Sequence, residues 1–141
     1  MFRLYYASAI DTCQEEAFKQ IVEYKKLFAK FALTLEVYGA GFNESPIIRV
    51  DSPPTKKGVV CAYDLRLIRQ CDIFLMVTDL KTFAAGTIME LEYARQLGMY
   101  IIIVCNTDDL RNIFLMSYAS KIINNINKLE ELETTLREII E

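Results

Sequence analysis

The sequence predicts an α/β fold in which helices cover both faces of a five-stranded parallel sheet. Along the 141 residues, short apolar runs alternate with longer segments of helical periodicity, which is the pattern of repeated strand–helix units. The run Tyr100–Cys105 is continuously apolar and rich in β-branched residues, as in strands that are buried on both faces. We therefore expect one flavodoxin-like, doubly wound domain over residues 1–141, with strand order 2-1-3-4-5 and right-handed crossovers.

The first half of the chain supplies two strands and two helices. Thr12-x-x-Glu15 is a capping box and predicts a helix from there to about Phe31. The second helix is expected over Val59–Arg69. Before it, residues 39–57 hold all three prolines of the chain and predict a long loop, which either simply connects the two elements or covers a substrate. The expected strands of this half are Arg3–Ser8 and Leu33–Tyr38.

The second half is built around residues 71–98. An apolar run ends at Thr78-Asp79, and a helical pattern then runs from Thr87 to Leu97 with Gly98 as its C′ residue. Ligands of doubly wound proteins bind where strands end and helices begin, so this stretch is the candidate site. The remaining expected elements are the strands Ile73–Val77, Tyr100–Cys105 and Ser120–Asn124 and a last helix over Lys128–Ile140.

The composition excludes several classes of chemistry. The chain contains no histidine, which removes Ser-His-Asp and Cys-His catalysis and histidine-ligated metals. Its four cysteines form no CxxC pair, so neither a zinc knuckle nor a thioredoxin motif is expected. The net charge is −3 without a basic run, which argues against nucleic-acid binding. No apolar run reaches membrane-spanning length and no signal peptide is evident, so we expect a cytoplasmic protein.

Carboxylates and tyrosines are the remaining candidates for catalysis. Glu90 lies one turn into the helix that follows Asp79, where it could point into the crevice as a nucleophile or acid. Locally, however, Thr87-x-x-Glu90 is also a capping box, in which Glu90 folds back on its own helix. Asp64 interrupts an apolar helical segment and is either a functional acid or a solvated side chain. Tyr5 and Tyr6 must face opposite sides of the sheet, so one of them could reach a catalytic carboxylate.

Phosphate-binding motifs are absent from the sequence. It contains neither GxGxxG nor a Walker A motif, and the loop after the first strand lacks glycine. A dinucleotide bound in the usual Rossmann manner is therefore not expected. We expect no cofactor and no metal.

Several stretches resemble the nucleoside 2-deoxyribosyltransferase family. The most specific is GTIMELEYARQLG, which is similar to the family signature GT-x-x-EL-x-YA-x-x-x-G. The other similar stretches are LYYASAI at Leu4–Ile10, IRVD at Ile48–Asp51, CDIF at Cys71–Phe74 and FLMSYA at Phe114–Ala119. The resemblance covers most of the chain in outline.

The resemblance implies roles for individual residues. By position, Glu90 falls on the nucleophile, Tyr5 on the tyrosine that orients it, and Asp64 on the aspartate that contacts the nucleobase. The implied reaction cleaves the N-glycosidic bond of a nucleoside through a glycosyl ester and passes the sugar to another base or to water. It also implies a homo-oligomer whose subunits share active sites. Further substrate contacts are expected from Asp79, Ala84, Gly86, Met89, Phe114 and Met116.

Two positions depart from the family pattern. Ala84 stands where the family has an aspartate that holds a sugar hydroxyl, and Phe114 stands where it has an asparagine for the 5′-hydroxyl. The serines that bind a 5′-phosphate in related deoxynucleotide N-hydrolases are missing as well. Three hypotheses stay open: a nucleoside transferase or hydrolase, a nucleotide N-hydrolase with Lys56, Lys57 or Arg111 as phosphate ligands, and a catalytically silent binding protein.

Overall fold

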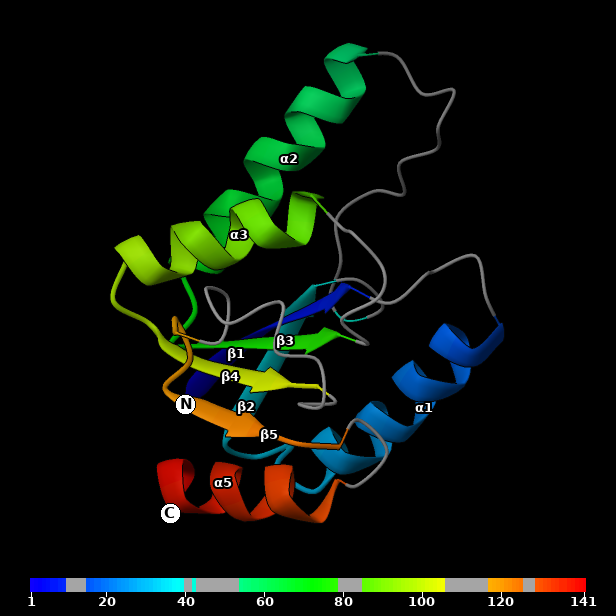
Figure 1. Cartoon of the computed structure of the whole chain (residues 1–141), viewed down its shortest axis with the longest axis vertical. Coiled ribbons are helices and arrows are strands. Elements are labelled where there is room, and N and C mark those ends of the chain that lie inside the picture. Colours follow the sequence, from blue (N-terminus) through cyan, green and yellow to red (C-terminus); the bar gives the residue numbers. More distant parts are fainter. Residues whose placement is uncertain (10–14, 40–41, 43–53, 79–84, 106–116, 126–128) are drawn as a thin grey trace.

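A five-stranded parallel sheet forms the centre of the computed structural model, which describes residues 1–9, 15–39, 42, 54–78, 85–105, 117–125 and 129–141 (Figure 1). The strand order is β2-β1-β3-β4-β5, which confirms the predicted flavodoxin-like topology. The strands are β1 (Phe2–Ala9), β2 (Leu35–Gly39), β3 (Ile73–Thr78), β4 (Tyr100–Val104) and β5 (Lys121–Ile123). The helices are α1 (Glu15–Ala29), α2 (Pro54–Arg69), α3 (Ala85–Gln96) and α5 (Glu130–Ile140).

Three helix starts differ from the sequence prediction. Helix α5 begins at Glu130 rather than Lys128. Helix α2 begins at Pro54 rather than Val59, so part of the expected loop is helical. Proline is favoured in the first helical turn because its missing N–H has no partner there in any case. Helix α3 begins at Ala85, two residues before the predicted start at Thr87. The predicted capping residue Thr12 lies outside the described residues.

The two faces of the sheet carry separate hydrophobic cores. Helices α1 and α5 lie on one side of the sheet and α2 and α3 on the other (Figure 1). Alternation along β1 sends Tyr6 into the first core and Tyr5 into the second. On the first side, the Tyr6 ring packs among Tyr24, Phe28 and Phe42, with its centroid 5.0 Å from that of Phe42. The fold therefore assigns Tyr6 to an aromatic core and Tyr5 to the side of α3.

Helix α3 ends as the sequence predicts. Gly98 has a φ of +72°, and the N–H of Met99 donates to the carbonyl of Ala94 at 3.2 Å. This is the Schellman arrangement, in which glycine adopts the left-handed conformation without a steric penalty. None of the helices in the described part of the chain is both long and apolar enough to span a bilayer.

The end of β2 requires a glycine for a steric reason. Gly39 has a φ of +117°, and a Cβ atom there would lie 2.2 Å from the backbone oxygen of Tyr6. Both the left-handed backbone and the close approach exclude a larger residue. The end of β2 is thus fixed against β1.

We predict that Gly39→Ala lowers the free energy of unfolding by roughly 2–4 kcal/mol, because backbone strain and a steric clash add together. Gly98→Ala is the matched control, since its φ is also positive but no atom lies within 4 Å of the added Cβ. The control should cost about 1 kcal/mol. Urea denaturation followed by circular dichroism measures both, and equal losses in the two variants would contradict the clash.

Candidate active site

Strand β1 contributes Tyr5, whose ring is held by the sheet itself. Tyr5 is buried and lies opposite Phe74 of β3 in the strand register. The two rings stack with centroids 5.8 Å apart and an interplanar angle of 11°. Stacking across neighbouring strands fixes the direction of the phenol. Tyr5 therefore presents its hydroxyl to α3 from a rigid support.

The first turn of α3 lies at the carboxyl end of β1. The Thr87 hydroxyl donates a hydrogen bond to the carbonyl of Ser8 at 3.3 Å. Since α3 begins at Ala85, Thr87 is already a helical residue and does not occupy the N-cap position. The capping box that the local sequence allowed for Thr87 and Glu90 is therefore not formed.

Glu90 instead turns toward Tyr5. The Tyr5 hydroxyl donates a hydrogen bond to the Glu90 carboxylate. The Oε2 atom of Glu90 is buried and has no hydrogen-bond partner in the described part of the chain. Burial raises the pKa of Glu90 to about 7, although the hydrogen bond from Tyr5 opposes this rise. Near neutral pH, the protonated and the ionised forms of the Glu90 carboxyl group are therefore both populated.

Helix α2 brings Asp64 to the same place. Asp64 is half-buried, and its negative charge contributes to the raised pKa values of both Glu90 and Tyr5. An aspartate on a fully solvated helix face would have little influence on buried groups. The structure thus brings together Tyr5, Asp64 and Glu90, three residues that are 26 positions or more apart in the sequence.

The other predicted contact residues are placed only in part. Gly86 and Met89 are exposed in the single chain, and 71% of the Met89 surface is accessible. Asp79, Ala84, Phe114 and Met116 lie outside the described residues. Ala94, four positions after Glu90 on the same helix, is fully buried in the core between α3 and the sheet.

Sequence reasoning missed the role of Thr87. The local sequence indicates only a helix cap for this residue, whereas its hydroxyl links α3 to β1. The signal in the sequence is weak: a small polar residue precedes Glu90 by three positions and so shares its helix face. Its burial, with 7% of its surface exposed, became evident only in the folded chain.

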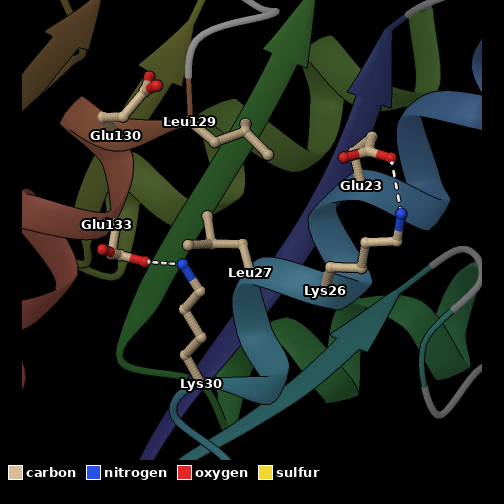
Figure 2. Close-up of a pocket in the computed structure, with 7 residues that line it drawn as sticks. All are labelled: Glu23, Lys26, Leu27, Lys30, Leu129, Glu130 and Glu133. Carbon is tan, nitrogen blue, oxygen red and sulfur yellow. Dashed lines mark hydrogen bonds and ion pairs between the residues drawn. The ribbon is translucent and has the colours of Figure 1, made fainter.

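A separate hollow of about 320 Å³ lies between α1 and α5, on the opposite side of the sheet from Glu90 (Figure 2). Lys26 pairs with Glu23 at 3.1 Å, and Lys30 pairs with Glu133 at 2.5 Å. The charges of each pair neutralise one another at the surface. The hollow is therefore a surface groove between two helices, lined by paired charges. The remaining lining residues are Leu27, Leu129 and Glu130.

The chemistry of the site follows from a carboxylate pair and a phenol. A buried carboxylate with a raised pKa can act as a nucleophile or a general acid, and a second carboxylate beside it can exchange a proton. Within the described residues, no three acidic or cysteine side chains are grouped so that they could hold a metal ion. The arrangement can stabilise a cationic centre and capture it covalently.

Comparison with solved structures shows what the fold is similar to. A 2-deoxyribosyltransferase from Bacillus psychrosaccharolyticus superposes with a TM-score of 0.72 at 20% identity, over 91% of this chain and 90% of that one. The CMP N-glycosidase BcmB of Clostridium botulinum superposes with a TM-score of 0.62 at 17% identity, over 97% and 98% of the two chains. A conserved protein from Enterococcus faecalis has a TM-score of 0.71 at 13% identity, over 99% of each chain.

Sequence comparisons add no relative. No family model matches the chain, and no curated protein matches it. The structural likenesses establish that the chain has the fold of a 2-deoxyribosyltransferase and of a CMP N-glycosidase.

We predict that Glu90→Gln becomes progressively more stable than the wild type as the pH rises from 5 to 8. The raised pKa means that the folded state holds a proton which the unfolded state has lost, so ionisation opposes folding between pH 4.5 and about 7. The relative gain in free energy of unfolding should reach roughly 2–3 kcal/mol at pH 8. Denaturant titrations at several pH values measure it.

Glu92→Gln is the control for this prediction, because Glu92 lies on the same helix but pairs with Arg95 at the surface. Its pKa is held at about 2 by the hydrogen bond from Arg95. The control should not gain stability relative to the wild type across this range. A constant difference between Glu90→Gln and the wild type from pH 5 to 8 would contradict a raised Glu90 pKa.

Proposed function

We propose that this protein cleaves the N-glycosidic bond of a nucleoside or deoxynucleoside through a glycosyl ester on Glu90, and passes the sugar to another base or to water. The observation that carries the proposal is the buried Glu90 carboxylate, which accepts a hydrogen bond from Tyr5 and lies near Asp64. The likeness of the fold to a 2-deoxyribosyltransferase and a CMP N-glycosidase supports the same class of substrate.

The first chemical step requires an ionised Glu90. As the bond to the base lengthens, positive charge develops on the anomeric carbon, and the Glu90 carboxylate stabilises it and then attacks that carbon. The hydrogen bond from Tyr5 holds one face of the carboxylate in a fixed direction. Because burial removes water from the carboxylate, its electrostatic effect on the developing cation is stronger than it would be in solvent.

Asp64 is assigned to the departing base. As the glycosidic bond breaks, its electrons move to the base nitrogen, and Asp64 protonates or hydrogen-bonds the base. In the second step an incoming base, or water, attacks the anomeric carbon and releases Glu90 as a carboxylate. Where Asp64 has given its proton to the departing base, it takes back the proton that the incoming group loses, so the cycle ends in its starting protonation state.

A nucleoside 5′-monophosphate N-hydrolase is the second candidate. The fold of the CMP N-glycosidase favours it, as does Ala84, which replaces the aspartate that the nucleoside family uses for a sugar hydroxyl. Lys56 and Lys57 fall in the first turn of α2, where the helix dipole favours an anion. A chain that binds a nucleoside derivative without turnover is the third possibility.

We predict base exchange and hydrolysis when the protein is incubated with a panel of nucleosides and nucleoside monophosphates, with and without free adenine. The rate should rise with pH through about 7 as Glu90 ionises. Glu90→Ala should lower the rate at least roughly a thousandfold, because the nucleophile is lost. Chromatography of released bases measures both activities.

Glu92→Ala is the matched variant, since it removes a glutamate that pairs with Arg95 at the surface, two positions further along α3, and should keep nearly full activity. Hydrolysis confined to monophosphates would select the nucleotide N-hydrolase. Binding of a nucleoside without turnover of any panel member would overturn both enzymatic proposals.

We further propose that the protein is a homo-oligomer in which α2 contacts a second copy. Ile68 is the buried residue among the described side chains of α2, whereas Val59 is 66% exposed and Tyr63 is also exposed. Met89 of α3 is exposed too, so a role for it in a pocket wall requires a second subunit. Apolar helix faces of this kind are typical of subunit contacts.

Light scattering coupled to size-exclusion chromatography tests this proposal. We predict a mass of at least two chains for the wild type and a lower mass for Val59→Glu, because a buried unpaired charge would oppose the contact. Leu33→Glu is the control, since Leu33 is 91% exposed in the turn before β2 and should leave the mass unchanged. A wild-type protein that is active as a monomer would contradict the proposal.

A further inference from the structure

Two polar contacts join α3 to β1, and they lie one helical turn apart. The first is the hydrogen bond from the Thr87 hydroxyl to the Ser8 carbonyl, and the second is the hydrogen bond from Tyr5 to Glu90. Thr87 and Glu90 are three positions apart and therefore lie on the same face of the helix. A movement of the first turn that breaks one contact must also displace the other.

The carbonyl of Ser8 lies in the part of β1 that extends beyond its pairing with β2. Pairing of β1 with β2 ends at Tyr6, whereas pairing with β3 continues to Ala9. Backbone groups in this overhang need partners other than β2, since an unpaired buried carbonyl is costly. The Thr87 hydroxyl supplies one donor, and it comes from the helix that carries Glu90.

Packing alone does not explain a threonine at this position. The side chain is buried, with 7% of its surface exposed, and valine would fill the same volume. The fully buried residues of α3, Leu91 and Ala94, are apolar. The hydroxyl is thus the distinguishing group, and its hydrogen bond to Ser8 crosses from the helix to the sheet.

We propose that Thr87 is a positioning residue: its hydroxyl fastens the first turn of α3 to the end of β1 and so keeps the Glu90 carboxylate within reach of the Tyr5 phenol. Its effect on catalysis rests on the function proposed above. Its effect on the contact between Glu90 and Tyr5 does not depend on that function and can be measured without a substrate.

The decisive experiment titrates Glu90 by carbon NMR in protein labelled at the glutamate carboxyl carbons, with Glu90→Gln used to assign the signal. Loss of the Tyr5 hydrogen bond raises the pKa of Glu90, because that bond favours the ionised carboxylate. Thr87→Val should therefore shift the titration to higher pH, and Thr87→Ser, which retains a hydroxyl, should restore it. In a Tyr5→Phe background, Thr87→Val should cause no further shift.

Thr135→Val is the matched control. Thr135 is 4% exposed in α5, and its hydroxyl donates to the Glu131 carbonyl at 2.9 Å within the same helix. Both substitutions remove a buried hydroxyl that bonds a backbone oxygen, so both should lower thermal stability. Only Thr87→Val should move the Glu90 titration. With an active enzyme, it should also lower kcat roughly tenfold with a smaller change in KM.

Thr87→Ala replaces Thr87→Val if the valine variant does not fold, since alanine also lacks the hydroxyl and has the highest helix propensity. An unchanged Glu90 titration in a folded variant without the hydroxyl would overturn the proposal. So would an equal shift in the Tyr5→Phe background. A shifted titration in a protein that turns over no nucleoside would support the positioning role while rejecting the proposed function.

Discussion

The rest of the structure depends on the placement of β1 between β2 and β3, with both of its faces covered by helices. Because consecutive side chains of a strand point to opposite faces, Tyr5 and Tyr6 divide between two environments. Tyr6 closes an aromatic core against α1, and Tyr5 supports the carboxylate of α3. The approach of Gly39 to the backbone of Tyr6 secures the β2 side of the same strand. One central strand therefore sets both the core and the site.

Burial of Glu90 is an energetic cost that the fold tolerates. A carboxylate with a buried and unpaired oxygen destabilises the native state whenever it is ionised. The hydrogen bond from Tyr5 offsets part of this cost, whereas the charge of Asp64 adds to it. An apolar side chain of similar size would pack as well as Glu90 does. Ionisable groups with perturbed pKa values cluster at functional sites, which supports the catalytic role proposed for Glu90.

The topology could be predicted because apolar runs alternate with helical segments along the chain. Strands that are apolar on both faces must be covered by helices on both sides of a parallel sheet. Where prediction failed, local signals had two meanings. The prolines before α2 suggested a loop, yet Pro54 begins the helix; Thr87 suggested a cap, yet it lies inside α3. Glu90, Tyr5 and Asp64 were predicted as candidates. The family resemblance selected Tyr5, whereas strand alternation alone left Tyr5 and Tyr6 open, because that choice depends on which face meets Tyr24 and Phe42. No local pattern contains that information.

In the proposed reaction, the burial of one carboxylate governs two properties together. Excluding water from Glu90 raises its pKa, which lowers the fraction that is nucleophilic below neutral pH. The same exclusion withholds water from the glycosyl ester, so an incoming base competes more effectively for the sugar. A more hydrated site would ionise Glu90 at lower pH but would also admit water as the acceptor. In the proposed reaction, the balance between transfer and hydrolysis therefore depends on how deeply α3 holds Glu90 against β1.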